Sequence, residues 1–304
     1  MKRTYINEAF LAGILLLGFL VGTFGQVPQT AKAELGSSTA KNGFKNEDEI
    51  RDKFNNWKLD EDARTWLTTM SYNVAEIESV IATKPHGEKA DVEVVVRTKA
   101  GSKKEGISIK LVSSPNGFNQ IDKRWLSHYV KMWKIPADVE AALKLFVGET
   151  PPTGTQAASL PANGETPAPT DLPANIKAKN VQAGSLRSTV RTYLNELEPQ
   201  AQKAVVDFFT ANKTAIVSDL FSGDGAHAAG WVMVALKATD KTRWVLRTDA
   251  DTIKYFAEGP VSITRQGNLK IGRITVQRKG GDGGRETAKM LQFKINPALL
   301  FDAK

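Results

Sequence analysis

Two side chains on neighbouring segments of this sequence could together hydrolyse a phosphate ester. Asp91 opens the β-branched run of residues 91–97 (DVEVVVR), and Lys110 lies in the run of residues 107–112 (ISIKLV). A carboxylate at a strand end can hold Mg²⁺, which polarises a phosphate and lowers the pKa of a bound water. A lysine beside that water orients it and stabilises the charge that builds up on the phosphate.

The spacing of these residues matches the layout of PD-(D/E)xK nucleases, in which an acid on one strand faces x-x-Lys on the next. Residues two apart face the same side of a strand, so Ser108 and Lys110 should both point toward Asp91, and we assign these three residues to catalysis. The polar residues 100–106 (AGSKKEG) predict the turn of a hairpin. Alone the pattern is weak, because an acid and a lysine across a hairpin also occur as surface decoration.

Further oxygen atoms near Asp91 could complete a metal site. Glu47 lies on a predicted amphipathic helix, and Glu93 follows Asp91 by two residues on the same strand face. We therefore expect the metal site to involve Asp91, Ile109, Glu47 and Glu93. The competing interpretation of Glu47 is a solvated acid on a helix surface.

Residues 113–120 (SSPNGFNQ), directly after the lysine strand, predict an exposed turn that carries an aromatic side chain. Exposed aromatics can wedge between base steps of DNA, and amides hydrogen-bond to base edges. We assign DNA contacts here to Phe118, Asn119, Gln120 and, just beyond the turn, Lys123. The alternative is a turn in which Phe118 folds back into the core.

A second basic stretch, rich in glycine, spans residues 277–294 (QRKGGDGGRETAKMLQFK). Its glycines let the backbone approach a ligand closely, and its polar side chains suit guanine edges, cytosine amino groups and phosphates. The glycine spacing excludes a P-loop and a dinucleotide-binding fingerprint. The DNA contacts expected here are Gln277, Arg278, Lys279, Asp282, Arg285, Gln292 and Lys294.

Composition agrees with a polyanionic partner and restricts the metal chemistry. The 304 residues carry a net charge of +8, which favours phosphate backbones but also fits a merely basic soluble protein. The absence of cysteine excludes disulfides, zinc–thiolate sites and thiol catalysis, and the three histidines lack the spacing of a metal box. Any metal site must use oxygen ligands, which suits Mg²⁺.

The elements that must position these side chains form a mixed set. Hydrophobic spacing predicts helices over residues 46–57, 121–133 and 186–209, and strands over residues 91–97, 107–112, 230–238, 242–247, 269–277 and 290–295. This order predicts an α/β (α+β) fold with a mixed central sheet flanked by helices.

Two segments stand apart from this pattern. Residues 1–33 combine a basic start, 17 uncharged residues and the small-x-small pattern Ala31-Lys32-Ala33, as a signal peptide or a mis-started extension would. Residues 148–185 hold six of the thirteen prolines and an imperfect repeat, which predicts a flexible linker insertion. We therefore expect a catalytic core in residues 34–147 and the rest of the core with the DNA-recognition region in residues 186–304.

Three segments, residues 34–58, 117–134 and 273–297, closely resemble the HinPI-like type II restriction endonucleases, which cut GCGC. The resemblance runs from Glu34 to the C-terminus and is broken only by the linker. It implies a restriction-endonuclease-like PD-(D/E)xK core, cleavage of double-stranded DNA after the first G of GCGC, and one or two Mg²⁺ ions. By the same resemblance Asp91 is the metal-binding acid, Lys110 the catalytic lysine and Phe118 an aromatic that enters the DNA.

Two departures from this family leave alternatives open. The family has Gln-Val-Lys where this chain has Ser108-Ile109-Lys110, so a DNA-binding protein with a decayed active site is a second interpretation. The additional residues 1–33 leave export of the nuclease, or a secreted protein without nuclease function, open, whereas restriction favours the cytoplasm. The partners that the resemblance implies are a methyltransferase that protects host sites and, since GCGC is palindromic, a second copy in a homodimer.

Overall fold

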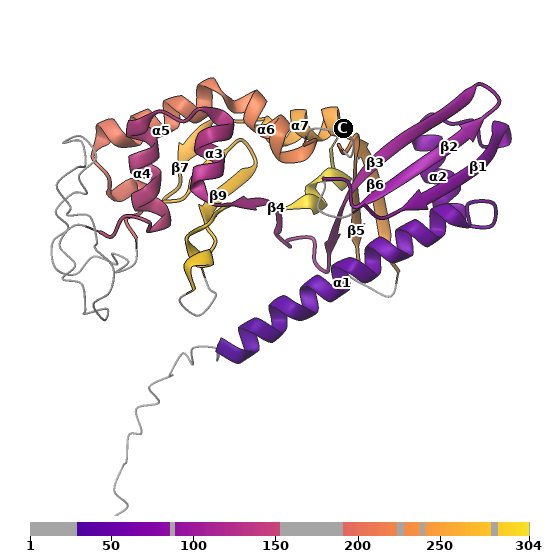
Figure 1. Cartoon of the computed structure of the whole chain (residues 1–304), viewed down its shortest axis with the longest axis horizontal. Coiled ribbons are helices and arrows are strands. Elements are labelled where there is room, and N and C mark those ends of the chain that lie inside the picture. Colours follow the sequence, from indigo (N-terminus) through magenta and orange to yellow (C-terminus); the bar gives the residue numbers. More distant parts are fainter. Residues whose placement is uncertain are drawn as a thin grey trace, which may run out of the picture.

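The computed structural model describes residues 29–85, 89–152, 191–223, 228–237, 241–280 and 285–303, with side chains described from residue 41. Two five-stranded sheets lie side by side along the long axis of the molecule (Figure 1). After the residues that the sequence predicts for catalysis and for DNA contacts, we call them the catalytic sheet and the recognition sheet. The catalytic sheet has the order β1-β2-β3-β5-β6, with bounds β1 (Ile77–Thr83), β2 (Val92–Thr98), β3 (Gly101–Val112), β5 (Trp231–Leu236) and β6 (Arg243–Thr248).

The catalytic sheet is mixed. Its neighbouring strands pair antiparallel except β3 and β5, which run parallel from the pair Ile107 and Trp231 to the pair Val112 and Leu236. Runs of β-branched residues such as VEVVV in β2 favour extended backbone and pack well on a pleated surface. The predicted mixed central sheet is confirmed.

The recognition sheet is antiparallel throughout and has the order β4-β10-β9-β8-β7. Its strands are β4 (Asn119–Arg124), β7 (Val261–Ile263), β8 (Leu269–Ile271), β9 (Ile274–Arg278) and β10 (Leu291–Ile295). Only six residues separate β3 from β4, so the chain passes directly from one sheet into the other. This short connection places the predicted DNA-binding turn between the two sheets.

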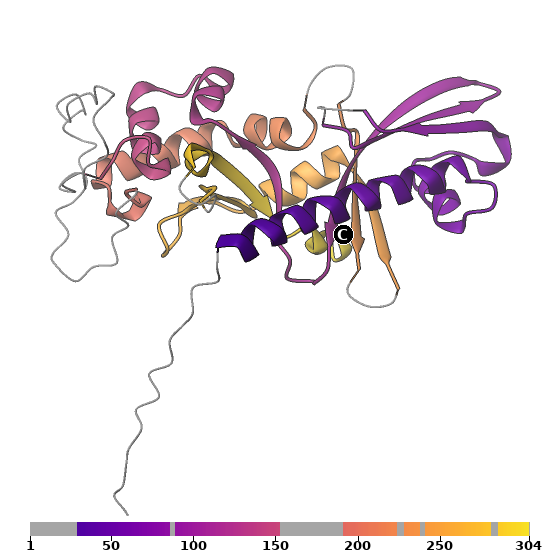
Figure 2. The ribbon, with the colours of Figure 1, turned by 60° about the horizontal axis from the view of Figure 1, so that its bottom comes forward.

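Among the described residues there are seven α-helices, and different helices lie beside different sheets. Helix α1 runs across the catalytic sheet toward the recognition sheet (Figure 2), whereas α3, α4 and α5 gather beside β7 and β9 (Figure 1). The helices are α1 (Gln29–Asn55), α2 (Glu61–Thr69), α3 (Leu126–Trp133), α4 (Ala137–Val147), α5 (Pro199–Ala211), α6 (Lys213–Phe221) and α7 (Asp249–Ala257). Shorter 3₁₀ turns occur at η1 (Val74–Glu76), η4 (Leu194–Glu196), η6 (Glu286–Lys289) and η7 (Pro297–Phe301).

The core has two parts, one on each face of β5. Val232, Val234 and Leu236 of β5 join a large cluster with the recognition sheet and its helices, whereas Met233 joins a smaller cluster beneath α1 and α2. Since successive side chains of a strand alternate between faces, both faces of this central strand are buried. Ile50 and Phe54 of α1, and Trp57 just after it, are buried in the smaller cluster, which agrees with the amphipathic helix predicted over residues 46–57.

Three predicted elements are corrected by the structure. Residues 121–133 are not one helix: β4 includes residues 119–124 because they pair with β10, and α3 starts only at Leu126. The hairpin turn is confined to Lys99 and Ala100, since residues 101–106 already pair with β2. The strand expected over residues 269–277 is a hairpin, β8 and β9, that reverses at Gly272 with φ +55°.

Other expectations are confirmed in part or fall outside the description. Strands β2, β5, β6 and β10 lie where the sequence predicted them, whereas β1, β7, α2, α4, α6 and α7 were not predicted. The helix expected over residues 186–209 is confirmed only from Pro199, which starts α5 because proline favours the first helical position; residues 191–198 contain the 3₁₀ turn η4 instead. Residues 153–190, which hold most of the expected linker, lie outside the described residues, and so do residues 1–28. Residues 29–33 form the first turns of α1. Within the described residues, no helix is long and apolar enough to cross a membrane.

Candidate active site

Asp91 lies at the start of β2, where the hairpin ladder fixes its position. Its main-chain N–H donates to Ile107 O at 2.8 Å, which extends the pairing of β2 with β3 by one residue. Its carboxylate Oδ2 accepts hydrogen bonds from the main-chain N–H of Ile109 at 2.6 Å and from Ser108 Oγ at 3.4 Å. The acid is therefore held against the lysine strand by the backbone of that strand.

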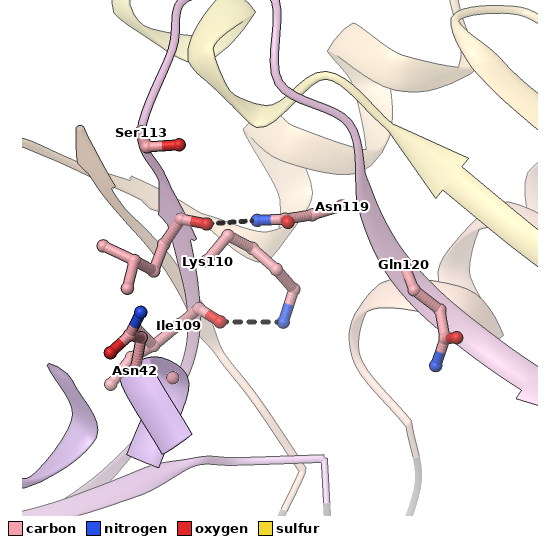
Figure 3. Close-up of a pocket in the computed structure, with 8 residues that line it drawn as sticks. Asn42, Ile109, Lys110, Ser113, Asn119 and Gln120 are labelled. Atoms are coloured by element: carbon pink, nitrogen blue, oxygen red, sulfur yellow. Dashed lines mark hydrogen bonds between the residues drawn. The ribbon is translucent and has the colours of Figure 1, made fainter. Parts of the chain in front are cut away.

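Lys110 turns back along its own strand toward these oxygens. Its Nζ donates to Ser108 Oγ at 2.9 Å and to Ile109 O at 3.0 Å, and it lies 3.7 Å from Asp91 Oδ2. Figure 3 shows the bond to Ile109 O and shows Lys110 and Gln120 pointing into the same space between β3 and β4. Asp91, Ser108 and Lys110, chosen from their spacing, thus lie together on one face of the hairpin.

The oxygen atoms around Lys110 are those that a hard divalent cation prefers. A carboxylate, a hydroxyl and a main-chain carbonyl converge on one positively charged group, and Mg²⁺ binds such donors together with water. No cluster of three or more His, Asp or Glu side chains is found among the described residues. A metal held here would therefore rest on Asp91 as its charged protein ligand, with neutral oxygens beside it.

Glu47 and Glu93 lie near this site, but both carboxylates already have lysine partners. Glu47 on α1 pairs with Lys84 at 3.1 Å, and Lys104 pairs with Glu93 at 2.9 Å. Burial raises the pKa of Glu47, which the bond from Lys84 opposes and the nearby charge of Asp91 reinforces. Their assignment as metal ligands stays a prediction.

The cavity beside Asp91 has a volume of about 400 Å³, and we call it the active-site cavity. It is lined by Lys89, Asp91, Ser108, Lys110, the consecutive β4 residues from Gln120 to Arg124, and Gly223. Lys110 and Gln120 also line a neighbouring cavity of about 300 Å³, which Asn42 and Gly43 of α1 border. Lys110 therefore shares its surroundings with β4 of the recognition sheet.

One face of the recognition sheet collects the amides and lysines that the sequence singled out. Lys123, Gln292 and Gln277 pair in one cross-strand row over β4, β10 and β9, and Gln120 pairs with Lys294 in another. The amide Nε2 of Gln292 donates to Gln120 Oε1 at 3.0 Å, which fixes both amides against each other. Five residues predicted from two distant segments thus share one surface next to the active-site cavity.

The other predicted DNA contacts have more varied surroundings. Phe118 is 59% exposed, so its ring does not fold back into the core. The Asn119 amide donates to Leu111 O at 2.8 Å (Figure 3), and Arg278 Nε donates to Val147 O at 2.8 Å, so each of these groups already bonds the protein. Their roles toward DNA stay predictions.

The basic loop between β9 and β10 concentrates positive charge. Burial lowers the pKa of Lys279, and the nearby charges of Lys123 and Arg285 lower it further. These three cations therefore lie close enough to repel one another, as the cations of a phosphate-binding surface do. Asp282, also predicted to contact DNA, lies outside the described residues.

Comparison with known proteins assigns the chain to a family. The sequence model of the R.HinP1I restriction endonuclease family matches residues 70–160 and 179–301, which together are more than half of the chain. The matched residues include Asp91, Lys110 and the recognition sheet. The chain belongs to the R.HinP1I restriction endonuclease family. It is accordingly a type II site-specific deoxyribonuclease.

The fold of this family member has a counterpart among solved structures. A crystal structure of the restriction endonuclease MspI in complex with its cognate DNA aligns over 83% of either chain, with a TM-score of 0.50 and 10% sequence identity. At this identity the likeness concerns the fold, which is that of a restriction endonuclease. No curated protein sequence matches the chain.

Sequence reasoning about this restriction endonuclease missed five residues that line the active-site cavity: Lys89, Ile121, Asp122, Arg124 and Gly223. Lys89 lines the cavity two residues before Asp91, and its side chain is only 17% exposed. Burial lowers the pKa of Lys89 to about 8; the charge of Asp122 opposes this shift, and Lys110 and Arg124 add to it. The alternation that linked Asp91 to Glu93 also extends backward to Lys89, so a signal was present.

Proposed function

We propose that this restriction endonuclease uses Mg²⁺ to hydrolyse double-stranded DNA at GCGC, after the first G. The observation that carries the proposal is the convergence of Asp91, Ser108, the Ile109 carbonyl and Lys110 beside Gln120 of the recognition sheet. This arrangement supports the proposal, because groups suited to hydrolysis lie next to an amide suited to reading bases. The recognition sequence itself rests on the family resemblance.

In the proposed hydrolysis, different residues bind the metal and orient the attacking water. Asp91, Ser108 Oγ and Ile109 O would hold the metal, which when bound supplies Lewis-acid activation of a phosphate and of water. The Lys110 ammonium orients the attacking water and stabilises negative charge on the phosphate in the transition state. Asp91 also accepts the Ile109 N–H, so the same carboxylate keeps the β3 backbone in place.

The paired amides of Gln120 and Gln292 suit the reading of bases in a groove. Gln292 is buried and donates to the Oε1 of the exposed Gln120, so the amide N–H groups of Gln120 can face outward. Lys123 and Lys294 on the same face offer ammonium groups for phosphates or for guanine O6 and N7. A GC-rich palindrome presents such acceptors on both strands.

Cleavage of an unmethylated plasmid in Mg²⁺ tests this function directly. We expect discrete fragments that end after the first G of GCGC and that vanish when GCGC is methylated. Asp91→Asn and Lys110→Met should each lower the cleavage rate by at least about 100-fold while duplex binding persists, because both remove groups used in the transition state. Lys99→Met, at the exposed tip of the same hairpin, is the matched control and should cut normally.

A smear of random fragments would refute sequence specificity, and activity retained in the Asp91 variant would refute the site. A second candidate function, a DNA-binding protein with a decayed active site, is favoured by Ser108, which offers neither charge nor reach. It predicts salt-sensitive binding of GCGC duplexes with no cutting in any divalent metal.

The setting of the enzyme belongs to the same proposal. We propose that it acts in the cytoplasm on incoming DNA, beside a methyltransferase that protects host sites, and that two copies meet on the palindrome. Mass spectrometry of the native N-terminus tests the location, since loss of residues 1–33 would indicate export. Sedimentation with and without a GCGC duplex tests the dimer.

A further inference from the structure

Lys89, just before β2, links the hairpin of β2 and β3 to β4 of the recognition sheet across the active-site cavity. Its Nζ donates to Ile121 O of β4 at 3.1 Å and lies 3.9 Å from Asp122 Oδ2 of the same strand. Two residues further along the chain, Asp91 accepts hydrogen bonds from β3. The segment from Lys89 to Asp91 therefore contacts β4 at Lys89 and β3 at Asp91.

The contact on β4 falls at an irregularity of that strand. In the pairing with β10, Phe293 faces Asp122 and Lys294 faces Gln120, so the register skips Ile121. A bulge of this kind redirects the side chains on either side of it. Here it lets both Gln120 and Lys123 face the same surface as Gln292. Lys89 thus donates a hydrogen bond to Ile121, the bulged residue on which the orientation of Gln120 and Lys123 depends.

The lysine stem is enclosed rather than loose. A Cβ at Gly223, whose φ is +66°, would come within 2.8 Å of Lys89 Cβ and 3.1 Å of its Cγ. Only glycine lets the chain after α6 lie so close to this stem. An enclosed side chain loses little further conformational entropy when it makes its bond, which suits a rigid link between two elements.

The charges that face Lys89 alternate across the cavity. Asp122 and Asp91 attract its ammonium, whereas Lys110 and Arg124 repel it. Asp122 in turn accepts hydrogen bonds from the Lys123 main chain at 2.6 Å and from Arg124 Nε at 3.2 Å, which ties the ammonium to the strand that carries Lys123. A shift of β4 on binding DNA would therefore displace Lys89 and, through the two residues that follow it, Asp91.

We propose that Lys89 is a positioning residue that couples base recognition by β4 to the placement of Asp91. The proposal rests on the proposed DNA cleavage. When the cognate bases seat Gln120 and Lys123, the Ile121 carbonyl holds Lys89, and the segment from Lys89 to Asp91 places the carboxylate for catalysis. A mismatched site seats β4 differently, and Asp91 is then misplaced.

The test compares single-turnover cleavage of a GCGC duplex and of a duplex with one base pair replaced, using the intact chain. Lys89→Met keeps the stem against Gly223 but removes the donor, and we expect its rate on GCGC to fall roughly 10- to 100-fold, as misplacement of a reacting group does. The rate on the altered duplex should fall less than threefold. Binding of GCGC without divalent metal should change less than threefold.

Two further variants separate positioning from folding. Lys89→Arg can still donate to the Ile121 carbonyl and should recover at least part of the cognate rate. Gln120→Ala removes the recognition amide, and Lys89→Met should cost much less in that background, because coupled residues are not additive. Lys99→Met, which removes an exposed lysine from the other end of the hairpin, should leave both rates unchanged.

Equal losses on the two duplexes, together with weaker binding and a smaller salt dependence, would overturn the inference and make Lys89 a phosphate contact. Normal cleavage by Lys89→Met would also overturn it. In either case the wild-type chain still cuts GCGC, so the proposed function survives. A wild-type chain that binds but does not cut would overturn the proposed function and, with it, this inference.

Discussion

At the residue scale, the ammonium group of Lys110 occupies the oxygens that we propose as metal ligands. Lys110 bonds Ser108 Oγ and Ile109 O and lies beside Asp91. Two positive charges cannot share these oxygens at such short range, so loading of the site with a cation requires Lys110 to move off them. The released ammonium would then be available for water and phosphate.

Replacement of Ser108 by a longer ligand tests how weakly this site holds its metal. In Ser108→Gln the amide oxygen can reach further than the hydroxyl, so we expect the Mg²⁺ concentration for half-maximal cleavage to fall about tenfold, the size of effect that ligand-shell changes commonly have. The measurement is a titration of the cleavage rate with Mg²⁺. Ser102→Gln, on the exposed part of the same strand, should leave the curve unchanged.

An unchanged or higher Mg²⁺ requirement in Ser108→Gln would contradict the assignment of Ser108 as a ligand.

Residue types and alternation were enough to select Asp91, Ser108 and Lys110, because a hairpin of two β-branched runs has few ways to pair. Lys89 was not selected, since its role depends on the Ile121 carbonyl, and nothing local to Lys89 reveals that contact. The internal bond of Asn119 to Leu111 O was unpredictable for the same reason. Short-range geometry could be predicted from sequence, and contacts between the sheets could not.

At the element scale, a buried carboxylate joins three elements on the far side of the hairpin. Glu105 of β3 is 5% exposed and accepts hydrogen bonds from Tyr72 Oη at 2.7 Å and from Trp231 Nε1 of β5 at 2.9 Å. It also pairs with Lys103 at 2.9 Å. This network ties the segment after α2 to the two strands that run parallel in the centre of the sheet.

Stability at high pH reports on this network. Burial raises the pKa of Tyr72, and the bond to Glu105 raises it further. Above about pH 10 the unfolded tyrosine ionises while the folded one stays neutral, so the free energy of unfolding should fall as pH rises from there. In Tyr72→Phe we expect this fall to be smaller by about 0.5–1 kcal/mol, since partial exposure screens the interaction.

The measurement is urea unfolding of the wild type and of Tyr72→Phe between pH 7 and 11. At pH 7 the variant should lose about 1.5 kcal/mol for the missing bond to a charged acceptor. Identical slopes of stability against pH for the two proteins would show that Tyr72 is not shielded in the folded state.

Element boundaries show where sequence patterns were insufficient. The run IDKRWLSHYVKMW has helical spacing, yet its first residues are a strand, because pairing with β10 satisfies their backbone better than a longer helix would. The partner strand lies about 170 residues away in the sequence. A window of 13 residues contains no information about such a partner.

At the scale of the whole molecule, the net charge of +8 should govern how the enzyme finds DNA. Each lysine that neutralises a phosphate releases condensed counterions, so affinity falls as salt rises. In Lys294→Gln we expect the slope of log Kd against log salt concentration to decrease by roughly one unit, with similar weakening on all sequences if the contact is to phosphate. Fluorescence anisotropy of duplex binding at several salt concentrations measures this slope.

Lys270→Gln, an exposed lysine of β8, is the matched control. A weakening of Lys294→Gln that is confined to GCGC would assign Lys294 to a base rather than to a phosphate.

The parallel pairing of β3 with β5 has a consequence for synthesis of the protein. Ser108, Ile109 and Lys110 pair with Val232, Met233 and Val234, so the strand that carries the lysine lacks one neighbour until more than three quarters of the chain has left the ribosome. A nascent or truncated polypeptide that lacks β5 therefore has Ser108 and Lys110 on an open sheet edge. We therefore expect the hairpin of β2 and β3 to reach its final sheet environment only after β5 has been synthesised.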